Sequence, residues 1–534
     1  MWVAVRIAFA VAAAVHGVAT GSPARADDGA AAVIVALIDT GSHPDLRWPR
    51  FEGYQDQLRQ IYEPRAFAPL WVRDGQPTPQ ASEVIASFAT ADAKGLDASD
   101  YDGAPLAAAA DQLRASHAPS ADEVGRFDLG LTIAVMRFVS DSATGRINPH
   151  QLGYGIEPEP NKLDLIALVP EMASEPNPGQ HFAALDPQLP VYGRMRDALL
   201  QYRAIAAQKD LPPMPDLPKL RPGGSDPGVR ALRARLIAYG DLTPGPPVPN
   251  NKAARYDAAL VAAVKHFQRR HGLEADGVIG AGTLNALQVP PAQRVRQIEL
   301  AMERLRWLPY RVPDRFLVIN IPEFRLRGFE DAEAVPRVDM NVVVGSSADK
   351  TETPVLYADM RYVIFRPYWL VPTSIAQKEI LPKAGRDPSY LQRQNMEVVK
   401  GRLRQRPGPT NSLGLLKFIF PNPFHVYLHD TPSKALFRRT RRDFSHGCIR
   451  VADAPALAEF VLDKQPGWDR QRIEEAMKRG TDNHYVDLQT PVPVYVVYAT
   501  AVVEPNGQVD FFDDIYGHDA TLSALLARGY PYSS

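Results

Sequence analysis

Residues 424–432 read FHVYLHDTP and residues 444–451 read FSHGCIRV, and the second stretch holds the only cysteine of the 534-residue chain. His446 lies two positions before Cys448, and His429 lies nineteen positions before it, in a segment whose composition is typical of a strand. A thiol becomes a nucleophile when a base within hydrogen-bond reach takes its proton. We therefore expect Cys448 to be a nucleophile, and spacing alone leaves both histidines open as its base.

The strand assignment decides which side chains accompany His429. Alternation along a strand predicts that His425, Tyr427 and His429 share one face. For His425 and Tyr427, packing or support of the site is favoured over direct catalysis. A metal site is a further alternative, and its ligands would be His425, His429, His446 and Cys448. Zinc retained after dialysis against a chelator would reveal it.

The residues after Cys448 predict how the thiol is presented. Residues 455–461 have the apolar spacing of an amphipathic helix, so Cys448 is expected on a tight turn at or near a helix N-terminus. Unpaired backbone N–H groups there would lower the thiol pKa and hold an oxyanion. Gly447 would let the backbone approach the scissile carbonyl closely.

Composition limits the classes of partner. The formal net charge is −1, which gives the whole chain no strong attraction to nucleic acid or to a membrane. Residues 401–450 hold ten Lys/Arg against two Asp/Glu, which suits a substrate rich in carboxylates or a solvated basic face equally well. The 49 prolines predict many turns and linkers, and the length predicts several domains.

The N-terminus has the features of an export signal. Residues 1–26 contain one early arginine, a short apolar run and an Ala-Arg-Ala site, which predict a signal peptide, with an uncleaved inner-membrane anchor as the alternative. The second apolar run, residues 30–38, is expected to be a core helix. A single cysteine in an exported chain has no partner for an internal disulfide.

The remaining sequence predicts an α+β multidomain chain. Helical spacing indicates a helical scaffold domain over 27–215 and a compact three-helix module over 216–292. A mostly-β domain is expected over 305–516, with a helical and irregular lid insertion at about 374–414 and a tail at 517–534. Its strands are predicted at 316–322, 340–345, 362–365, 417–420, 425–428 and 492–498, and a late hairpin turns at Asn506–Gly507.

Two sets of sequence motifs resemble known protein families. Residues 264–268 (VKHFQ), 271–273 (HGL) and 276–280 (DGVIG) resemble the peptidoglycan-binding module of cell-wall enzymes. Residues 407–414 (PGPTNSLG) and 427–432 (YLHDTP), together with the SHGCIRV word, resemble the L,D-transpeptidase family with the YkuD-type catalytic fold, in its large multidomain Gram-negative branch. The resemblance extends over nearly the whole mature chain.

The resemblance implies catalytic roles for five residues. Cys448 would be the nucleophile, His429 the general base, and Asp430 the third member of the triad, through its backbone carbonyl. His446 would shape the site, and Gly447 and Cys448 would supply oxyanion-hole N–H groups. The substrate-binding residues would be Arg450, Ser445, Tyr427 and Trp369.

The implied reaction is acyl transfer between peptidoglycan stem peptides without a cofactor. A thioester on the cysteine would form with release of D-alanine, and the diaminopimelate amine of a second stem would resolve it into a 3→3 cross-link. The same cysteine could instead serve an L,D-carboxypeptidase or D-amino-acid exchange, and a non-catalytic wall-binding protein is a remote alternative. A periplasmic location, carbapenem inhibition, cell-wall synthesis partners and a monomeric state are also expected.

Overall fold

The computed structural model describes residues 24–157, 163–246, 249, 253–309, 313–330 and 335–530. The expected signal peptide therefore lies almost wholly outside the described residues. None of the described helices has the length and apolarity needed to cross a membrane. The chain forms two compact units, the first from Met1–Ala86, Asp102–Ala134 and Ile166–Pro178, and the second from Ser87–Tyr101, Val135–Leu165 and Gly179–Ser534.

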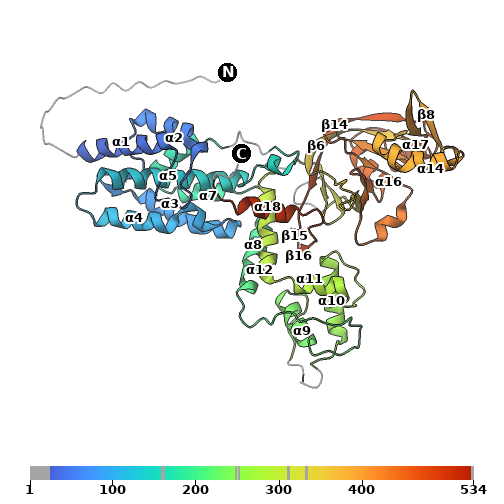
Figure 1. The fold of residues 1–534 in the computed structure, drawn as a ribbon, viewed down its shortest axis with the longest axis horizontal. Coiled ribbons are helices and arrows are strands. Elements are labelled where there is room, and N and C mark those ends of the chain that lie inside the picture. The colour runs from blue at the N-terminus through green and yellow to red at the C-terminus, as the bar shows by residue number, and fades with distance from the viewer. Residues whose placement is uncertain are drawn as a thin grey trace. The chain divides into compact units, whose positions relative to one another are not determined.

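The first unit is helical, as its apolar spacing predicts (Figure 1). It contains α1 (Ala24–Thr40), η1 (Glu52–Tyr54), α2 (Gln55–Tyr62), η2 (Glu63–Arg65), β1 (Val72–Arg73), β2 (Gln76–Pro77), α3 (Pro79–Ser87), α4 (Gly103–Ala115), the first part of α5 (Ala121–Thr144) and most of α6 (Leu165–Ser174). Ala30, Ile34 and Ile38, spaced four residues apart on α1, are fully buried. The run at 30–38 is therefore a core helix.

A buried polar network holds this unit together. The Asp128 carboxylate on α5 accepts hydrogen bonds from the Tyr62 hydroxyl and the Trp71 backbone N–H, both at 2.6 Å. The Trp71 indole N–H donates to the Thr132 hydroxyl at 2.9 Å. Burial raises the pKa of Asp128. Both carboxylate oxygens are satisfied within the unit, which is the arrangement of a structural network.

The second unit begins with helices and includes the expected three-helix module. Its helices before the β domain are η3 (Phe88–Lys94), η4 (Ala98–Tyr101), η5 (Pro149–Leu152), α7 (Gly179–Ala184), α8 (Pro190–Ala206), α9 (Val229–Ala238), α10 (Ala258–Arg270), α11 (Ala281–Gln288) and α12 (Pro291–Leu305). In the module, α9, α10 and α11 gather around Leu232, Leu236, Leu260, Val264 and Phe267, which are fully buried (Figure 1). The prediction of three helices is confirmed, and their core is continuous with residues of α8, α12 and the hairpin at residues 501–511.

The β domain is built on one mixed sheet that closes on itself. Its strand order is β12-β5-β13-β11-β10-β6-β14-β3-β4, and β4 also pairs with β5. The strands are β3 (Phe316–Asn320), β4 (Arg325–Phe329), β5 (Val338–Gly345), β6 (Leu356–Phe365), β10 (Leu416–Ile419), β11 (Leu428–His429), β12 (Asp443–Ser445), β13 (Ile449–Val451) and β14 (His484–Val497). Alternate residues of these strands, such as Phe418, Leu428 and Ile449, form one buried core. The helices that follow are η8 (Lys434–Arg438), α16 (Ala454–Leu462) and α17 (Arg470–Arg479).

The lid insertion differs from its prediction. It contains α13 (Thr373–Ile375), the π-helix η7 (Ala376–Ile380), α14 (Leu381–Arg386) and α15 (Tyr390–Arg393), but also an antiparallel sheet of β7 (Trp369–Leu370), β8 (Met396–Val399) and β9 (Arg402–Gln405). The β8–β9 turn consists of Lys400 and Gly401, both at positive φ (49° and 76°). This is the geometry of a type I′ hairpin, which a Lys-Gly pair signals poorly. The lid has a small core of its own, made of Ala376, Ile380 and Leu403.

The C-terminal part confirms one prediction and changes another. β15 (Ala501–Val503) and β16 (Val509–Phe511) form the expected hairpin around Asn506–Gly507. The segment expected as a tail begins with α18 (His518–Leu526), whose Leu522 and Leu526 belong to the core of the β domain. This helix is therefore a packed element of the domain.

Candidate active site

The sheet register sets three charged or titratable side chains side by side. His429 on β11 is paired with Lys417 on β10 and with Arg450 on β13. Paired residues of neighbouring strands project from the same face. Since Phe418 and Leu428, one position along, project into the core, Lys417, His429 and Arg450 form a row on the outer face.

Cys448 lies at the end of this row, one position before β13. It has a free thiol and is half-buried. The same alternation puts it on the face of Arg450, diagonal to His429, and diagonal neighbours on one face lie within reach of long side chains. Tyr427 lies beside the thiol, and both its backbone and its hydroxyl oppose the rise in the pKa of Cys448. The row and the thiol form one continuous site.

The turn before the thiol is held by side-chain hydrogen bonds. The Ser445 hydroxyl donates to the Cys448 carbonyl at 2.6 Å and accepts from the Gly447 N–H at 3.2 Å. The Thr353 hydroxyl donates to the Gly447 carbonyl at 2.8 Å. Gly447 has a φ of +105°, which side chains rarely adopt. Ser445 is therefore a residue that shapes the turn.

These contacts change the expected set of oxyanion donors. The Gly447 N–H donates a hydrogen bond to the Ser445 hydroxyl and is therefore not free to bind an oxyanion, contrary to its expected role. The Cys448 N–H has no hydrogen-bond acceptor among the described residues. The Cys448 N–H is therefore left as a backbone donor next to the thiol.

The expected helix N-terminus at the thiol is wrong. Cys448 leads into β13, and α16 begins only at Ala454, where Asp453 caps it by accepting from the Ala456 N–H at 3.0 Å. β13 has three residues and pairs with both β11 and β5. A strand this short leaves no clear alternation in the sequence, and the apolar helix after it dominates the pattern.

His429 is buried and its ring is oriented by the backbone. Its Nδ1 lies 2.5 Å from the Asp430 carbonyl oxygen. A carbonyl only accepts, so Nδ1 carries the proton and Nε2 is left as the basic nitrogen. The Asp430 carboxylate is used elsewhere, by the Leu415 N–H at 3.0 Å and by the Lys434 Nζ at 2.7 Å. Asp430 thus meets the histidine through its carbonyl, the position that the resemblance implies.

Burial sets the protonation state of the resting site. It lowers the pKa of His429 to about 3, helped by Arg450 and by the weaker influence of Lys417. Burial also raises the pKa of the Cys448 thiol, although Tyr427, Lys417 and Arg450 oppose the rise. Both shifts favour the uncharged forms. At neutral pH the pair is therefore a neutral thiol and a neutral imidazole, not a preformed ion pair.

Alkylation of the protein by iodoacetamide should report this state. Only the thiolate reacts, and the pKa of Cys448 is raised, so the rate should rise with pH to a midpoint above about 8.5, the ordinary value for cysteine. Alkylation rates from pH 5 to 10, followed by intact mass, give the midpoint. A midpoint below 7 would show a thiolate–imidazolium pair and contradict the neutral resting state.

The second histidine faces the lid. His446 Nε2 lies 2.7 Å from Glu379 Oε1 on the π-helix η7, and both side chains are about half exposed. Of the two histidines that spacing left open, His429 is the buried one within the row. Trp369, expected to bind substrate, lies on β7 and packs against the lid core. Tyr427 contacts the thiol, and its ring centroid is 5.8 Å from that of His429.

His425 does not lie where the strand pattern placed it. β11 consists only of Leu428 and His429, while His425 is exposed in a turn at φ +56°. The turn is fixed by Asn422, whose carboxamide oxygen accepts from the backbone N–H groups of Phe424 and Val426. The prediction of a strand at 425–428 is therefore wrong for residues 425–427, because local hydrogen bonding of Asn422 competes with sheet pairing.

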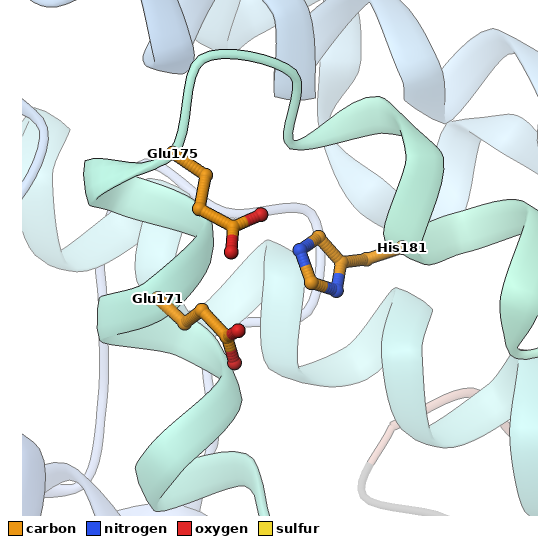
Figure 2. A group of neighbouring side chains, drawn as sticks. All are labelled: Glu171, Glu175 and His181. Carbon is orange, nitrogen blue, oxygen red and sulfur yellow. The ribbon is translucent and has the colours of Figure 1, made fainter.

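The metal alternative gains no support from the geometry. Within the part of the chain that the structure describes, the side chains grouped as potential ligands do not include His425, His429, His446 or Cys448. Two members of that group, Glu171 on α6 and Glu175 just after it, are shown in Figure 2. They belong to the helical part of the chain, and Cys448 is not a member of the group.

Two residues of the site were not singled out by the sequence. Lys417 belongs to a predicted strand and to a segment, Lys417-Phe418, that resembles the family, but neither feature assigns it to the site; alternation against the core residue Phe418 puts it on the outer face. Glu379 belongs to the lid, and its contact with His446 spans 67 residues. No local pattern signals such a contact.

Comparisons with known proteins agree with this architecture. The model of the L,D-transpeptidase catalytic domain (YkuD) matches residues 314–494, that of the "Putative peptidoglycan binding domain" matches 225–287, and that of the scaffold domain matches 56–199. A protein of Haemophilus influenzae described as "Putative L,D-transpeptidase" is 30% identical over 251 residues, which are 43% of this chain and 49% of that protein. The match thus spans about half the length of this curated relative.

Proposed function

We propose, from the premise that this chain contains a YkuD-type L,D-transpeptidase catalytic domain, a peptidoglycan-binding domain and a scaffold domain, that it is an L,D-transpeptidase acting through Cys448. One observation carries the proposal. A free thiol lies beside a buried histidine whose Nδ1 is held by the Asp430 carbonyl, and both lie within the matched catalytic domain. This is the arrangement of an activated cysteine nucleophile.

The first half-reaction forms a thioester. Sγ of Cys448 attacks the carbonyl carbon of the third stem residue, diaminopimelate, as the thiol proton passes to Nε2 of His429. The Cys448 N–H donates to the developing oxyanion. Collapse of the tetrahedral intermediate breaks the amide bond, and the departing D-alanine amine takes the proton from His429. The products are a neutral imidazole, free D-alanine and an acyl-enzyme.

The second half-reaction forms the cross-link. The side-chain amine of diaminopimelate in a neighbouring stem attacks the thioester carbonyl and gives a proton to His429. The C–S bond breaks, the thiolate recovers the proton, and a 3→3 amide remains. Because the resting thiol and imidazole are both neutral, proton transfer accompanies the attack in the first step.

The lid supports transfer to an amine over hydrolysis. His446, two residues before the nucleophile, is bonded to Glu379 of the lid, so the lid contacts the catalytic turn. A closed lid excludes water from the thioester. L,D-carboxypeptidase activity and D-amino-acid exchange use the same acyl-enzyme and differ only in the acceptor. A wall-binding protein without activity would not form the acyl-enzyme at all.

The other modules suit a substrate that is an extended polymer. The module of α9, α10 and α11 would bind peptidoglycan and hold the catalytic domain at the wall. We place the protein in the periplasm as a monomer that uses no metal or other cofactor, exported by residues 1–26 and acting in peptidoglycan biosynthesis, cell-wall organisation and cell shape beside other cell-wall synthesis proteins.

A carbapenem adduct tests the proposal on the protein alone. Meropenem acylates an activated cysteine by ring opening, so the intact mass should rise by one whole meropenem, and peptide mapping should place the adduct on Cys448. Unchanged mass after prolonged incubation would contradict an activated nucleophile. The variant Lys464→Met, a change at an exposed lysine, should react as the wild type does.

A further inference from the structure

Two cations beside His429 have no carboxylate partner among the described residues. Lys417, largely buried on β10, has its Nζ 3.8 Å from the ring centroid of Tyr427. Arg450 on β13 has a buried Nε without a hydrogen-bond partner. Some buried arginines of the same unit are paired with a carboxylate, such as Arg270 with Asp241 and Arg304 with Asp519. The row therefore holds two positive charges that no acid of the described chain neutralises.

Such an arrangement is costly unless an anion completes it. Burial lowers the pKa of both Lys417 and Arg450, since each loses water without gaining a carboxylate. The nearest group that could become an anion is Cys448, and burial keeps it a thiol. An anion bound from outside the chain would supply the negative charge that this row lacks.

We propose that Lys417 and Arg450 form a carboxylate-binding subsite on either side of His429, which recognises a carboxylate of the donor stem peptide and strengthens His429 as a base when it is filled. This inference rests on the proposed function for the identity of the ligand. Lys417 supplies a point charge and Arg450 a planar fork, which together suit one carboxylate. A tetrapeptide donor offers two such groups, the terminal carboxylate of D-alanine and the side-chain carboxylate of diaminopimelate.

The coupling to His429 follows from the charges that face its ring. Arg450 and Lys417, from the two neighbouring strands, disfavour the imidazolium, whereas Asp430, the residue after His429, favours it. The remaining neighbours, Tyr427 and Cys448, are neutral in the resting site. A bound carboxylate offsets the two cations, so the imidazole becomes a better proton acceptor only with donor in place. An empty site would thereby keep its thiol protonated and unreactive.

The subsite can be tested without relying on transpeptidation. Iodoacetate and iodoacetamide both lose iodide to the Cys448 thiolate, and only iodoacetate carries a carboxylate. The ratio of their alkylation rates at pH 8 should fall about tenfold in Lys417→Met, because the variant loses one attracting charge. Lys417→Arg should keep most of the ratio, and Lys464→Met should leave it unchanged. An unchanged ratio in a Lys417→Met protein that melts like the wild type would overturn the subsite.

Modified donors identify which carboxylate is bound. Two modified donors are compared: a tetrapeptide that ends in D-alaninamide and one whose diaminopimelate side-chain carboxylate is amidated. The donor whose altered group occupies the subsite should show a kcat/KM for release of its terminal residue that is about tenfold lower. In Lys417→Met that same modification should cost little. Equal losses in wild type and Lys417→Met for both donors would overturn the assignment. A falling iodoacetate ratio without any release from tetrapeptide would instead contradict the proposed function and leave the anion site standing.

Discussion

Cys448→Ala will release no D-alanine from a disaccharide-tetrapeptide, with a rate at least about 10⁴-fold below that of the wild type. The thioester needs sulfur, and the described chain offers no other thiol. The site should nevertheless keep its structure, because the turn is held by Ser445 through the backbone carbonyl of Cys448 and the N–H of Gly447. D-Alanine can be followed with a coupled D-amino-acid oxidase assay.

Cys448→Ser is the matched control for this loss. A serine hydroxyl fits the same space, but its proton is harder to remove, and His429 is a weak base in this site. The serine variant should therefore also be inactive while binding donor as the wild type does. Release by Cys448→Ala at more than a few per cent of the wild-type rate would mean that another nucleophile acts.

His429→Ala should lower kcat/KM for D-alanine release about 10²–10⁴-fold, the usual range for loss of a general base. The ring is buried, its tautomer is fixed by the Asp430 carbonyl, and it is central to the row. His446→Ala should cost no more than about tenfold, since His446 contacts the lid through Glu379. Steady-state kinetics on the two variants, each checked by thermal unfolding, compares them directly.

The two histidine variants settle a choice that spacing left open. A His446→Ala variant that is slower than His429→Ala would show that His446 is the base and that its contact with Glu379 belongs to another state. Glu379→Gln is the matched control, because it removes the negative charge that contacts His446 while leaving both histidines. It should resemble His446→Ala in kcat and should not resemble His429→Ala.

Much of the fold follows from local patterns in the sequence. Helices with a full apolar stripe, such as α1 and α10, and apolar runs with β-branched residues, such as β3 and β5, give a clear signal in the sequence. Short elements do not. β11 and β13 have two and three residues, and only their neighbours in the sheet make them strands. The turn at His425 and the Lys400–Gly401 hairpin depend on backbone conformations that the sequence signals poorly.

Some residues of the site, too, are marked by local sequence, and others are brought there only by the fold. The sequence motifs around Cys448 and His429 identify both as candidate catalytic residues. The row with Lys417 and Arg450 arises from strand pairing between separate segments of the chain. The engaged N–H of Gly447 and the contact between His446 and Glu379 depend on three-dimensional hydrogen bonding. Local sequence therefore marks the nucleophile, and register determines what surrounds it.

The most direct test of the central claim is product analysis with a purified disaccharide-tetrapeptide. The wild-type protein should convert it into a dimer whose tandem mass spectrum shows a bond between two diaminopimelate residues, with one D-alanine released per bond. Cys448→Ala should give none of this dimer. Tripeptide alone would assign the enzyme to carboxypeptidases, and the absence of any product from active-site-titrated wild type would contradict an acyl-transfer role for Cys448.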